Sequence, residues 1–329
     1  MKIGLRLPHY GEYCTHERIF NNARWIEKAG FNSVWVRDHL SFRPHAWEKQ
    51  YTNILEPFTT LSAIAILTEK LILGTATVVT YRHPLVTSAL FGTLAYIAKG
   101  RIIAGIGAGG VRAPLDAVGI PFEKRGKIVE EFLQILRLTW SQDHVSFHGE
   151  FYKFDDITID PRPPAGTPIY YGGLSKAAVR RAVTYCDGIL LQHAPFKILD
   201  DLIAHVRQLE EKHQKQKRTV LSYSPWISID RDSRKAWERM NIERVAQSLK
   251  HQISQDERWK GTGETKEDLE GAIVVGSPQE CVDQLAKFQE RGYDEIVLDL
   301  RNTLDRWDES IELLATDVLP HFKEDRSSP

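Results

Sequence analysis

The sequence predicts an α/β fold, a single (β/α)8 TIM barrel with insertion segments, and three observations favour it. Short apolar runs alternate with amphipathic segments along the 329 residues of the chain. Most of these runs are nearly continuous, as in Ser33–Asp38, which is typical of parallel strands covered by helices. Glycines end helical segments just before the next strand, as at Gly30, Gly100 and Gly292. The same alternation would also suit a long doubly wound sheet.

The predicted elements follow one another in a regular order. The eight strands are Ile3–Pro8, Ser33–Asp38, Leu71–Val79, Arg101–Gly107, Pro168–Gly172, Gly188–Gln192, Val220–Ile229 and Asp294–Leu300. The helices are Thr15–Ala29, Phe58–Thr68, Pro84–Ala98, Glu123–Trp140, Ser175–Tyr185, Phe196–Lys215, Asp232–His251, Pro278–Arg291 and Leu304–Phe322.

Two segments interrupt this order. Val145–Pro164 has alternating aromatic residues and predicts a β-hairpin inserted before the fifth strand. Ser254–Gly276 is polar and rich in glycine, lysine and glutamate, which predicts a mobile loop at the barrel mouth. No linker or longer repeat is evident, so we expect one domain over residues 1–329.

Composition limits the classes of partner. Lys and Arg number 43 against 44 Asp and Glu, so no basic surface for nucleic acid or an anionic membrane is expected. The apolar run Leu61–Leu67 is too short to cross a bilayer. Cys14, Cys186 and Cys281 lie far apart and lack CxxC spacing, so neither disulfides nor a zinc site is expected. We expect a cytoplasmic protein.

Candidate functional side chains follow the predicted strands, because barrel active sites lie at the C-terminal ends of the strands. His9 follows the first strand, Asp38 and His39 the second, and His193 the sixth. An imidazole can donate to a cofactor carbonyl or shuttle a proton near neutral pH. The alternative is that Asp38 caps the next segment and His39 packs as a satisfied core histidine.

Two glycine-rich turns also fall at strand ends. Gly105–Gly110 matches GxGxxG, but the chain is expected to stay irregular until Glu123, whereas a dinucleotide fingerprint opens directly into a helix. We interpret it as a glycine-lined wall for a flat ring, with a simple tight turn as the alternative. Gly172–Ser175 instead leads from a strand into a helix that Ser175 can cap, which suits a phosphate or an ordinary βα turn.

Taken together, several short segments of the sequence resemble the luciferase-like monooxygenase family. They occur in the family's order up to about residue 320. The segments are Gly30–His39, Leu73–Val78, Tyr81–Pro84, Gly100–Gly110, Gly119–Phe122 with Arg125, Phe147–Tyr152, Pro168–Gly173, Asp187–Gly188 and Gly276–Pro278. Many segments in one register are more specific than any single motif.

The resemblance implies a (β/α)8 barrel that binds reduced FMN or the deazaflavin coenzyme F420 in its mouth. Asp38 and His39 are implied beside the ring, with a cis peptide near Ala76–Thr77 behind it. The residues implied to bind the cofactor are Asp38, His39, Ala76, Thr77, Gly107, Ala108, Gly109, Gly172, Gly173 and Ser175. The last three would hold the phosphate. His39 is the expected catalytic residue, with Asp38 orienting it.

The sequence also departs from the family pattern. Gly110 stands where the family often has a large aromatic residue or an acid, and Ala113 and Pro114 stand where acids are common. These differences argue against a catalytic glutamate and against glucose 6-phosphate as substrate. They predict a roomier substrate pocket, lined by His9, Gly110 and His193.

Several functions remain open. Hydride transfer between F420 and a small organic substrate is favoured by Asp38–His39 together with Tyr81–Pro84. Oxygen insertion by reduced FMN, with a separate flavin reductase, is the alternative; the favoured reaction could likewise draw on a separate F420 reductase. A metal-dependent hydrolase using His9, Asp38, His39 and His193 lacks an HxH ligand pair, so no functional metal is expected. A catalytically silent flavin-binding relative also fits. The family resemblance favours a homodimer.

Overall fold

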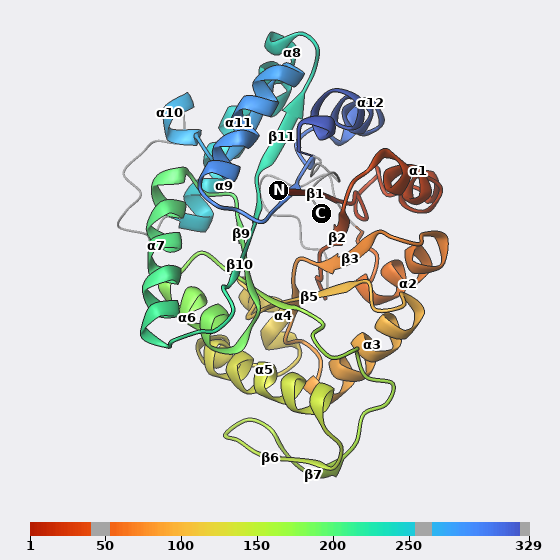
Figure 1. Ribbon diagram of the computed structural model, residues 1–329, viewed down its shortest axis with the longest axis vertical. Helices are drawn as coiled ribbons and strands as arrows, with labels where there is room; N and C mark the ends of the chain where they lie inside the picture. Colours follow the sequence, from red (N-terminus) through yellow and green to blue (C-terminus); the bar gives the residue numbers. More distant parts are fainter. Residues whose placement is uncertain (41–52, 254–264, 323–329) are drawn as a thin grey trace.

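The computed structural model describes residues 1–40, 53–253 and 265–322. In this part of the chain, eight parallel strands form a closed ring surrounded by helices (Figure 1). In order, they are β1 (Lys2–Arg6), β2 (Ser33–Val36), β3 (Ile72–Thr75), β5 (Ile102–Gly107), β8 (Ile169–Gly172), β9 (Gly188–Gln192), β10 (Val220–Ser224) and β13 (Glu295–Leu298). Each strand pairs with the next, and β13 pairs with β1. The predicted (β/α)8 barrel is confirmed, and the open sheet is excluded.

The helices follow the strands and cover the outside of the ring (Figure 1). The main ones are α1 (Asn22–Ala29), α2 (Pro57–Leu67), α3 (Pro84–Ile97), α5 (Arg125–Ser141), α6 (Lys176–Tyr185), α7 (Phe196–Lys212), α11 (Pro278–Glu290) and α12 (Trp307–Leu313). Local sequence sets their ends. Gly30 ends α1 with φ 100°, and Ser277 begins α11 with a capping box to Glu280. No helix of the described residues is long and apolar enough to span a membrane.

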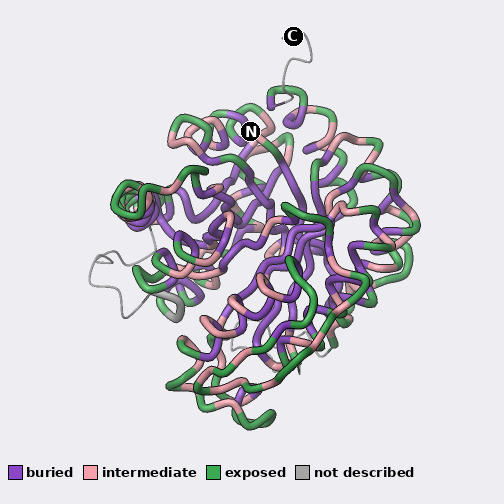
Figure 2. Tube along the Cα trace, turned by 60° about the horizontal axis from the view of Figure 1, so that its bottom comes forward, coloured by how far each residue is buried: buried purple, intermediate pink, exposed green. Residues whose placement is uncertain are grey.

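Side chains of the strands separate into two apolar layers. Val34 and Val36 belong to a large cluster that also contains helix residues, so they face the helices. Trp35 lies between them in a smaller cluster of strand-end and strand residues, including Tyr170 and Val297, and therefore faces the barrel axis. Figure 2 shows the buried interior and the exposed outer surfaces of the helices. This alternation fixes which side chains reach the barrel mouth.

The barrel interior also holds a buried acid. Glu295 is 3% exposed and accepts hydrogen bonds from the hydroxyls of Ser33 (2.6 Å) and Ser222 (3.3 Å). The indole of Trp35 donates in turn to Ser33 Oγ at 2.8 Å. Burial raises the pKa of Glu295 and outweighs the opposing hydrogen bond from Ser33 and the positive charge of Lys2.

The inserted hairpin is confirmed. Strands β6 (Val145–His148) and β7 (Lys153–Ile157) pair antiparallel and project beyond α5 (Figure 1). The predicted loop over residues 254–276 is wrong in its last part. Residues 254–264 lie outside the described residues, but α10 (Lys266–Leu269) and β12 (Ile273–Gly276) follow them. The apolar run in β12 forms a strand because it can pair with β11 (Trp226–Ile229) beside the main ring.

Several predicted elements are divided in the structure. The strand expected over 71–79 stops at Thr75 and resumes as β4 (Val78–Val79), after a cis Ala76–Thr77 peptide. The strand expected over 220–229 divides into β10 and β11 at Pro225, which has no N–H for a continuous ladder. The helix expected over 232–251 divides into α8 (Ser233–Met240) and α9 (Ile242–Ile253) at Asn241, where φ is 51°.

Three further helical segments differ from the prediction. A π-helical turn (Glu17–Asn21) precedes α1. The C-terminal segment joins α12 to short turns at Leu304–Arg306, Leu314–Val318 and Leu319–Phe322. The short helix α4 (Arg112–Ala117) and a 3-10 turn (Phe122–Lys124) occupy the stretch predicted to be irregular before Glu123. Pro114 is compatible with α4 because it lies in the first turn, where its missing N–H has no intrahelical partner.

Candidate active site

Alternation along the strands divides the barrel mouth into two sides. Gly107 and Gly172 end β5 and β8 in the phase of the inner cluster, and Thr77 lies beside them after β3. We call these three residues the glycine side. Arg6, Gln192 and Asp299 are in the same inward phase at the ends of β1, β9 and β13. With their neighbours His193 and Arg301, they form the arginine side.

On the glycine side, two glycines make room for one threonine. A Cβ on Gly107 would lie 2.4 Å from Thr77 Oγ1, and a Cβ on Gly172 would lie 2.5 Å from Thr77 Cγ2. Any side chain at either position would therefore displace Thr77. The cis Ala76–Thr77 peptide implied by the family resemblance is present. This contact gives a packing reason for glycine at position 107, and the place of Gly107 beside a cofactor ring stays a prediction.

The rest of this wall is more open. Gly109 has φ 81°, and its Cβ would press against Val79 Cγ1 at 2.8 Å. A Cβ at Gly110 would meet no atom within 4 Å. Ala108 is half-buried between these positions and Gly107. Gly110 is exposed, so the wall after β5 is unobstructed there, and the roomier substrate pocket stays a prediction.

Asp38 is fixed by groups from two other elements. Its Oδ2 accepts from the Arg82 guanidinium at 2.7 Å and from the Val79 amide of β4 at 3.0 Å. Arg82 also contacts Asp38 Oδ1 at 3.2 Å and Glu56, the residue before α2, at 3.0 Å. Burial raises the pKa of Asp38, while Arg82 and the Val79 amide oppose the shift. His39, the next residue along the chain, is half-buried. The arrangement suits an orienting role for Asp38.

The predicted phosphate site lies where β8 leads into α6. Ser175 Oγ accepts from the Ala178 amide at 3.1 Å, so the predicted N-cap is confirmed. Gly173 has φ 155°, and a Cβ there would lie 2.8 Å from the Ala178 Cβ. Ser175 and Lys176 are both exposed at this helix start. The N–H groups and the helix dipole favour an anion at this place.

The arginine side is a hydrogen-bonded network of buried charges. Asp299 Oδ2 is 2.6 Å from Arg301 Nη2 and 3.7 Å from Arg6 Nη1. Arg6 Nη2 also donates to Gln192 Oε1 at 2.8 Å. Burial alone would raise the pKa of Asp299, but Arg301, His193 and Arg6 hold it well below its usual range. Asp299 is therefore a carboxylate at any physiological pH.

The two histidines predicted for the substrate pocket are held differently. His9 is buried, with Nδ1 3.0 Å from the Leu7 carbonyl, and its Nε2 accepts from the Arg37 amide at 2.9 Å. Nδ1 thus contacts its own segment and Nε2 links the segment after β1 to the one after β2, which favours a structural role. Burial lowers the pKa of His9 to about 4, so its ring is neutral.

His193 belongs to the arginine side. Its Nε2 lies 3.2 Å from Asp299 Oδ2, and its ring stacks on Trp226 with centroids 4.0 Å apart. Burial lowers the pKa of His193 to about 3, although Asp299 opposes the shift. The neutral ring therefore serves as a hydrogen-bond donor to Asp299 and leaves the carboxylate its negative charge.

Sequence reasoning missed Arg6, Asp299 and Arg82 as candidate site residues. Arg6 and Asp299 were placed inside strands, and Arg82 appeared only within a longer phrase. A charged residue in the inward phase of an apolar strand is the signal that could have revealed the first two, because burial of a charge requires a partner. Nothing local predicts that Arg82 reaches Asp38, which lies 44 positions earlier.

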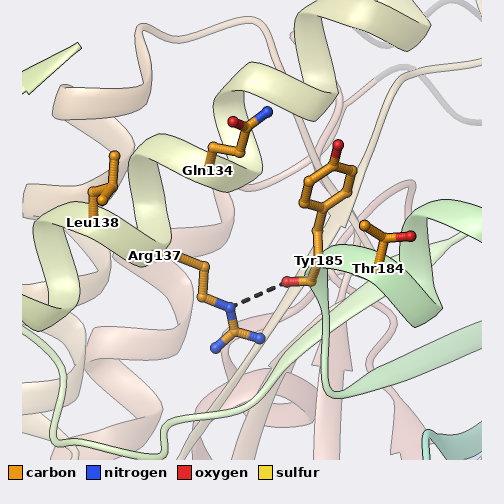
Figure 3. A pocket seen from close by; sticks show the side chains of 5 residues that line it. All are labelled: Gln134, Arg137, Leu138, Thr184 and Tyr185. Atoms are coloured by element: carbon orange, nitrogen blue, oxygen red, sulfur yellow. Dashed lines mark hydrogen bonds between the residues drawn. The ribbon is translucent and has the colours of Figure 1, made fainter. Parts of the chain in front are cut away.

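Neither a metal-binding cluster nor the surface pocket of the protein lies at the mouth in the described part of the chain. No group of three or more His, Cys, Asp or Glu residues could hold a metal ion within the described ranges. A surface pocket lies elsewhere, between α5 and α6 (Figure 3). It is lined by Gln134, Arg137, Leu138, Thr184 and Tyr185 near the C-terminal ends of both helices, and hence on the face opposite the mouth.

Together, these observations define a (β/α)8 barrel of the kind that the sequence resembles. A sequence model of the luciferase-like monooxygenase family matches residues 7–295, and the chain belongs to this family.

Individual relatives agree with this assignment. Over 331 aligned residues, the chain is 28% identical to an F420-dependent glucose-6-phosphate dehydrogenase from Intrasporangium calvum, with 95% of this chain and 96% of the relative covered. It is 21% identical to the F420-dependent tetrahydromethanopterin reductase from Methanopyrus kandleri (TM-score 0.77; 98% and 99% covered). The monooxygenase RslO1 from Streptomyces bottropensis is 20% identical (TM-score 0.80; 98% and 100% covered). These two solved structures have the same fold as this chain.

Proposed function

We propose that this protein is an F420-dependent oxidoreductase that transfers a hydride to or from a small organic substrate in the barrel mouth. The observation that carries the proposal is the placement of Asp38 and His39. Asp38 is buried and held by Arg82 and the Val79 amide, and His39 follows it at the edge of the glycine side. The F420-dependent relative aligned over nearly the whole chain supports the choice of cofactor.

The residues at the mouth fit such a cofactor. Gly110 leaves the wall after β5 unobstructed, and the capped start of α6 offers backbone N–H groups and Lys176 for a phosphate. Asp38, His39, Ala76 and Thr77 would flank the ring, with Gly107, Ala108 and Gly109 beside it. Gly172, Gly173 and Ser175 would hold the phosphate. When bound, F420 supplies or accepts a hydride.

The chain's own side chains supply the acid–base chemistry. His39 holds or moves the proton at the substrate oxygen, because imidazole is the side chain whose ordinary pKa lies nearest neutral pH. Asp38 keeps its position through Arg82 and orients this edge of the site. His193 donates to Asp299 and stays neutral, so it is not the proton carrier. The absence of an acid at Gly110, Ala113 and Pro114 argues against glucose 6-phosphate as the substrate.

Equilibrium titration of the purified protein with F420 and with FMN tests the cofactor. We expect F420 to bind and the reduced complex to consume no oxygen. Preferential binding of FMN, with oxygen consumption once reduced by a separate flavin reductase, would instead identify the two-component monooxygenase. Binding of neither cofactor would contradict both functions.

We also propose that the protein is a homodimer in which α2 and α3 form the contact. These two adjacent helices carry no charged residue over Pro57–Leu67 and Pro84–Ile97. Ile66 and Tyr96 are nonetheless 74% and 77% exposed. Large exposed apolar side chains on two neighbouring uncharged helices favour an interaction site. The outer face of α7, in contrast, is charged.

Light scattering tests the dimer. Ile66→Lys combined with Tyr96→Lys places charges in the contact and should yield a monomer at concentrations where the wild type is dimeric. Ala204→Lys, at an exposed position of α7, is the control and should remain dimeric. A monomeric wild type, or a dimer that survives the double substitution, would contradict the proposal.

A further inference from the structure

Arg6 is a buried cation with few partners of its own. Its side chain is 5% exposed, and its Nη2 donates to Gln192 at 2.8 Å. Its nearest described carboxylate oxygen, Asp299 Oδ2, is 3.7 Å from Nη1, longer than a hydrogen bond. Its Nε has no hydrogen-bond partner among the described residues.

The carboxylate nearest to Arg6 is already occupied. Arg301 donates to Asp299 Oδ2 through Nε at 2.8 Å and lies 2.6 Å away through Nη2. The Arg301 amide donates to Oδ1 at 3.1 Å, and His193 Nε2 lies 3.2 Å from Oδ2. Asp299 thus makes its short contacts to Arg301 and His193. Its interaction with Arg6 is longer and therefore weaker.

Arg137, which lines the pocket of Figure 3, has two short protein acceptors and provides a comparison for Arg6. Its Nη2 lies 2.7 Å from Asp187 Oδ2, and its Nε donates to the Tyr185 carbonyl at 3.1 Å. Arg137 is also 37% exposed and can reach water, whereas Arg6 cannot. The more deeply buried arginine therefore has the weaker set of acceptors.

This imbalance is costly without another anion. Burial lowers the pKa of Arg6 to about 10; Arg301 and Arg37 add to the shift, and Asp299 opposes it. A guanidinium removed from water needs charge-assisted hydrogen bonds to offset its lost hydration. Arg6 faces the barrel axis in the uppermost layer of the mouth, where a substrate would supply such bonds.

We propose that Arg6 binds an oxyanion of the substrate, a carboxylate or a phosphate, on the arginine side. This inference rests on the proposed function, since it names the chemical class of the substrate for that site. Gln192 holds one end of the guanidinium, and Arg301 saturates Asp299, so that the Arg6 Nε is left for the ligand. The arginine side then sets specificity while the glycine side holds the cofactor.

Calorimetric titration of the F420-saturated protein tests the proposal, with ionic strength held constant by chloride. The probes are acetate, inorganic phosphate and acetamide, a neutral analogue of acetate. We expect acetate or phosphate to bind and acetamide not to bind; the stronger of the two anions identifies the group. Arg6→Met should weaken this binding at least about tenfold, whereas Arg137→Met should leave it unchanged.

Other outcomes would overturn the proposal. They are equal binding of acetamide, binding of neither anion, or unchanged anion binding by a folded Arg6→Met protein. Should Arg6→Met fail to fold, Arg6→Lys decides, since a lysine keeps the charge but loses the planar donor set; unchanged anion affinity would then reject the role of Arg6. F420 affinity is measured first, so failure of the proposed function would be seen separately, as loss of cofactor binding by the wild type.

Discussion

The glycine side and the arginine side of the barrel mouth are both built from strand ends, but they present opposite surfaces. On the glycine side, Gly107 and Gly172 lack side chains so that Thr77 can fit between them. On the arginine side, Arg6 and Asp299 are buried charges at strand ends, and Arg301 pairs with Asp299 from the next turn. A flat, largely apolar ring suits the first surface, and an anionic group suits the second. Asp38 and His39, after β2, lie on the boundary.

The largest expected effect is on the rate of hydride transfer when His39, at this boundary, is replaced. His39→Ala should lower the rate of single-turnover hydride transfer about 10²–10⁴-fold, the usual contribution of a general acid or base. The melting temperature should change little, because His39 is half-buried and not part of the apolar core, and the rate is measured with F420 at saturation so that any loss of cofactor affinity is removed. His39→Gln, which keeps a hydrogen-bond donor but cannot titrate, should be nearly as slow. A His39→Ala rate within a few-fold of wild type would leave His39 a structural residue.

The second expected effect is on the pH dependence of stability. It compares two buried acids, Glu295 at the start of β13 and Asp299 just after its end. The folded pKa of Asp299 is depressed, so its stabilising contribution is full above the unfolded pKa and is lost as pH falls toward the folded value. The pKa of Glu295 is raised, so its contribution is full below the unfolded pKa and is lost as pH rises through the folded value.

Denaturant unfolding across the pH range should therefore separate the two acids. Asp299→Asn should lower the free energy of unfolding at neutral pH by about 3 kcal/mol, because it leaves Arg6 and Arg301 buried without their carboxylate. Its stability should also decline less in acid than that of the wild type. Glu295→Gln should remove a decline seen in the wild type as pH rises. Identical pH profiles for both variants would contradict these assignments.

The smallest effect concerns the phosphate. Ser175→Asp keeps an N-capping side chain but adds a negative charge at the start of α6, and should weaken F420 binding roughly five- to tenfold. Ser175→Asn, which has the same shape without the charge, should bind F420 within about twofold of wild type. A deazaflavin riboside without phosphate should bind all three proteins alike. Equal F420 affinity for the Asp and Asn variants would place the phosphate elsewhere.

The sequence predicted the barrel more completely than its mouth. Strand order and the hairpin followed from periodicity, because buried parallel strands and amphipathic helices each leave a local pattern. The divisions at Thr75 and Pro225 did not, since residues typical of strands stand on both sides of each place. Asp38, His39 and the glycine turns were found as strand ends. The Arg82–Asp38 and Arg6–Asp299 contacts could not be predicted, because they join residues brought together only when the ring closes.

Equilibrium titration with F420, followed by the fluorescence of the coenzyme, tests the division of the mouth most directly. In Gly107→Ala, the new Cβ would meet Thr77 Oγ1 at 2.4 Å, and such overpacking costs roughly 1–3 kcal/mol. We expect this variant to lose F420 affinity and the double variant with Thr77→Ala to regain part of it. Arg6→Met, on the opposite side, should bind F420 like the wild type. Normal F420 binding by Gly107→Ala together with lost binding by a folded Arg6→Met would contradict the account.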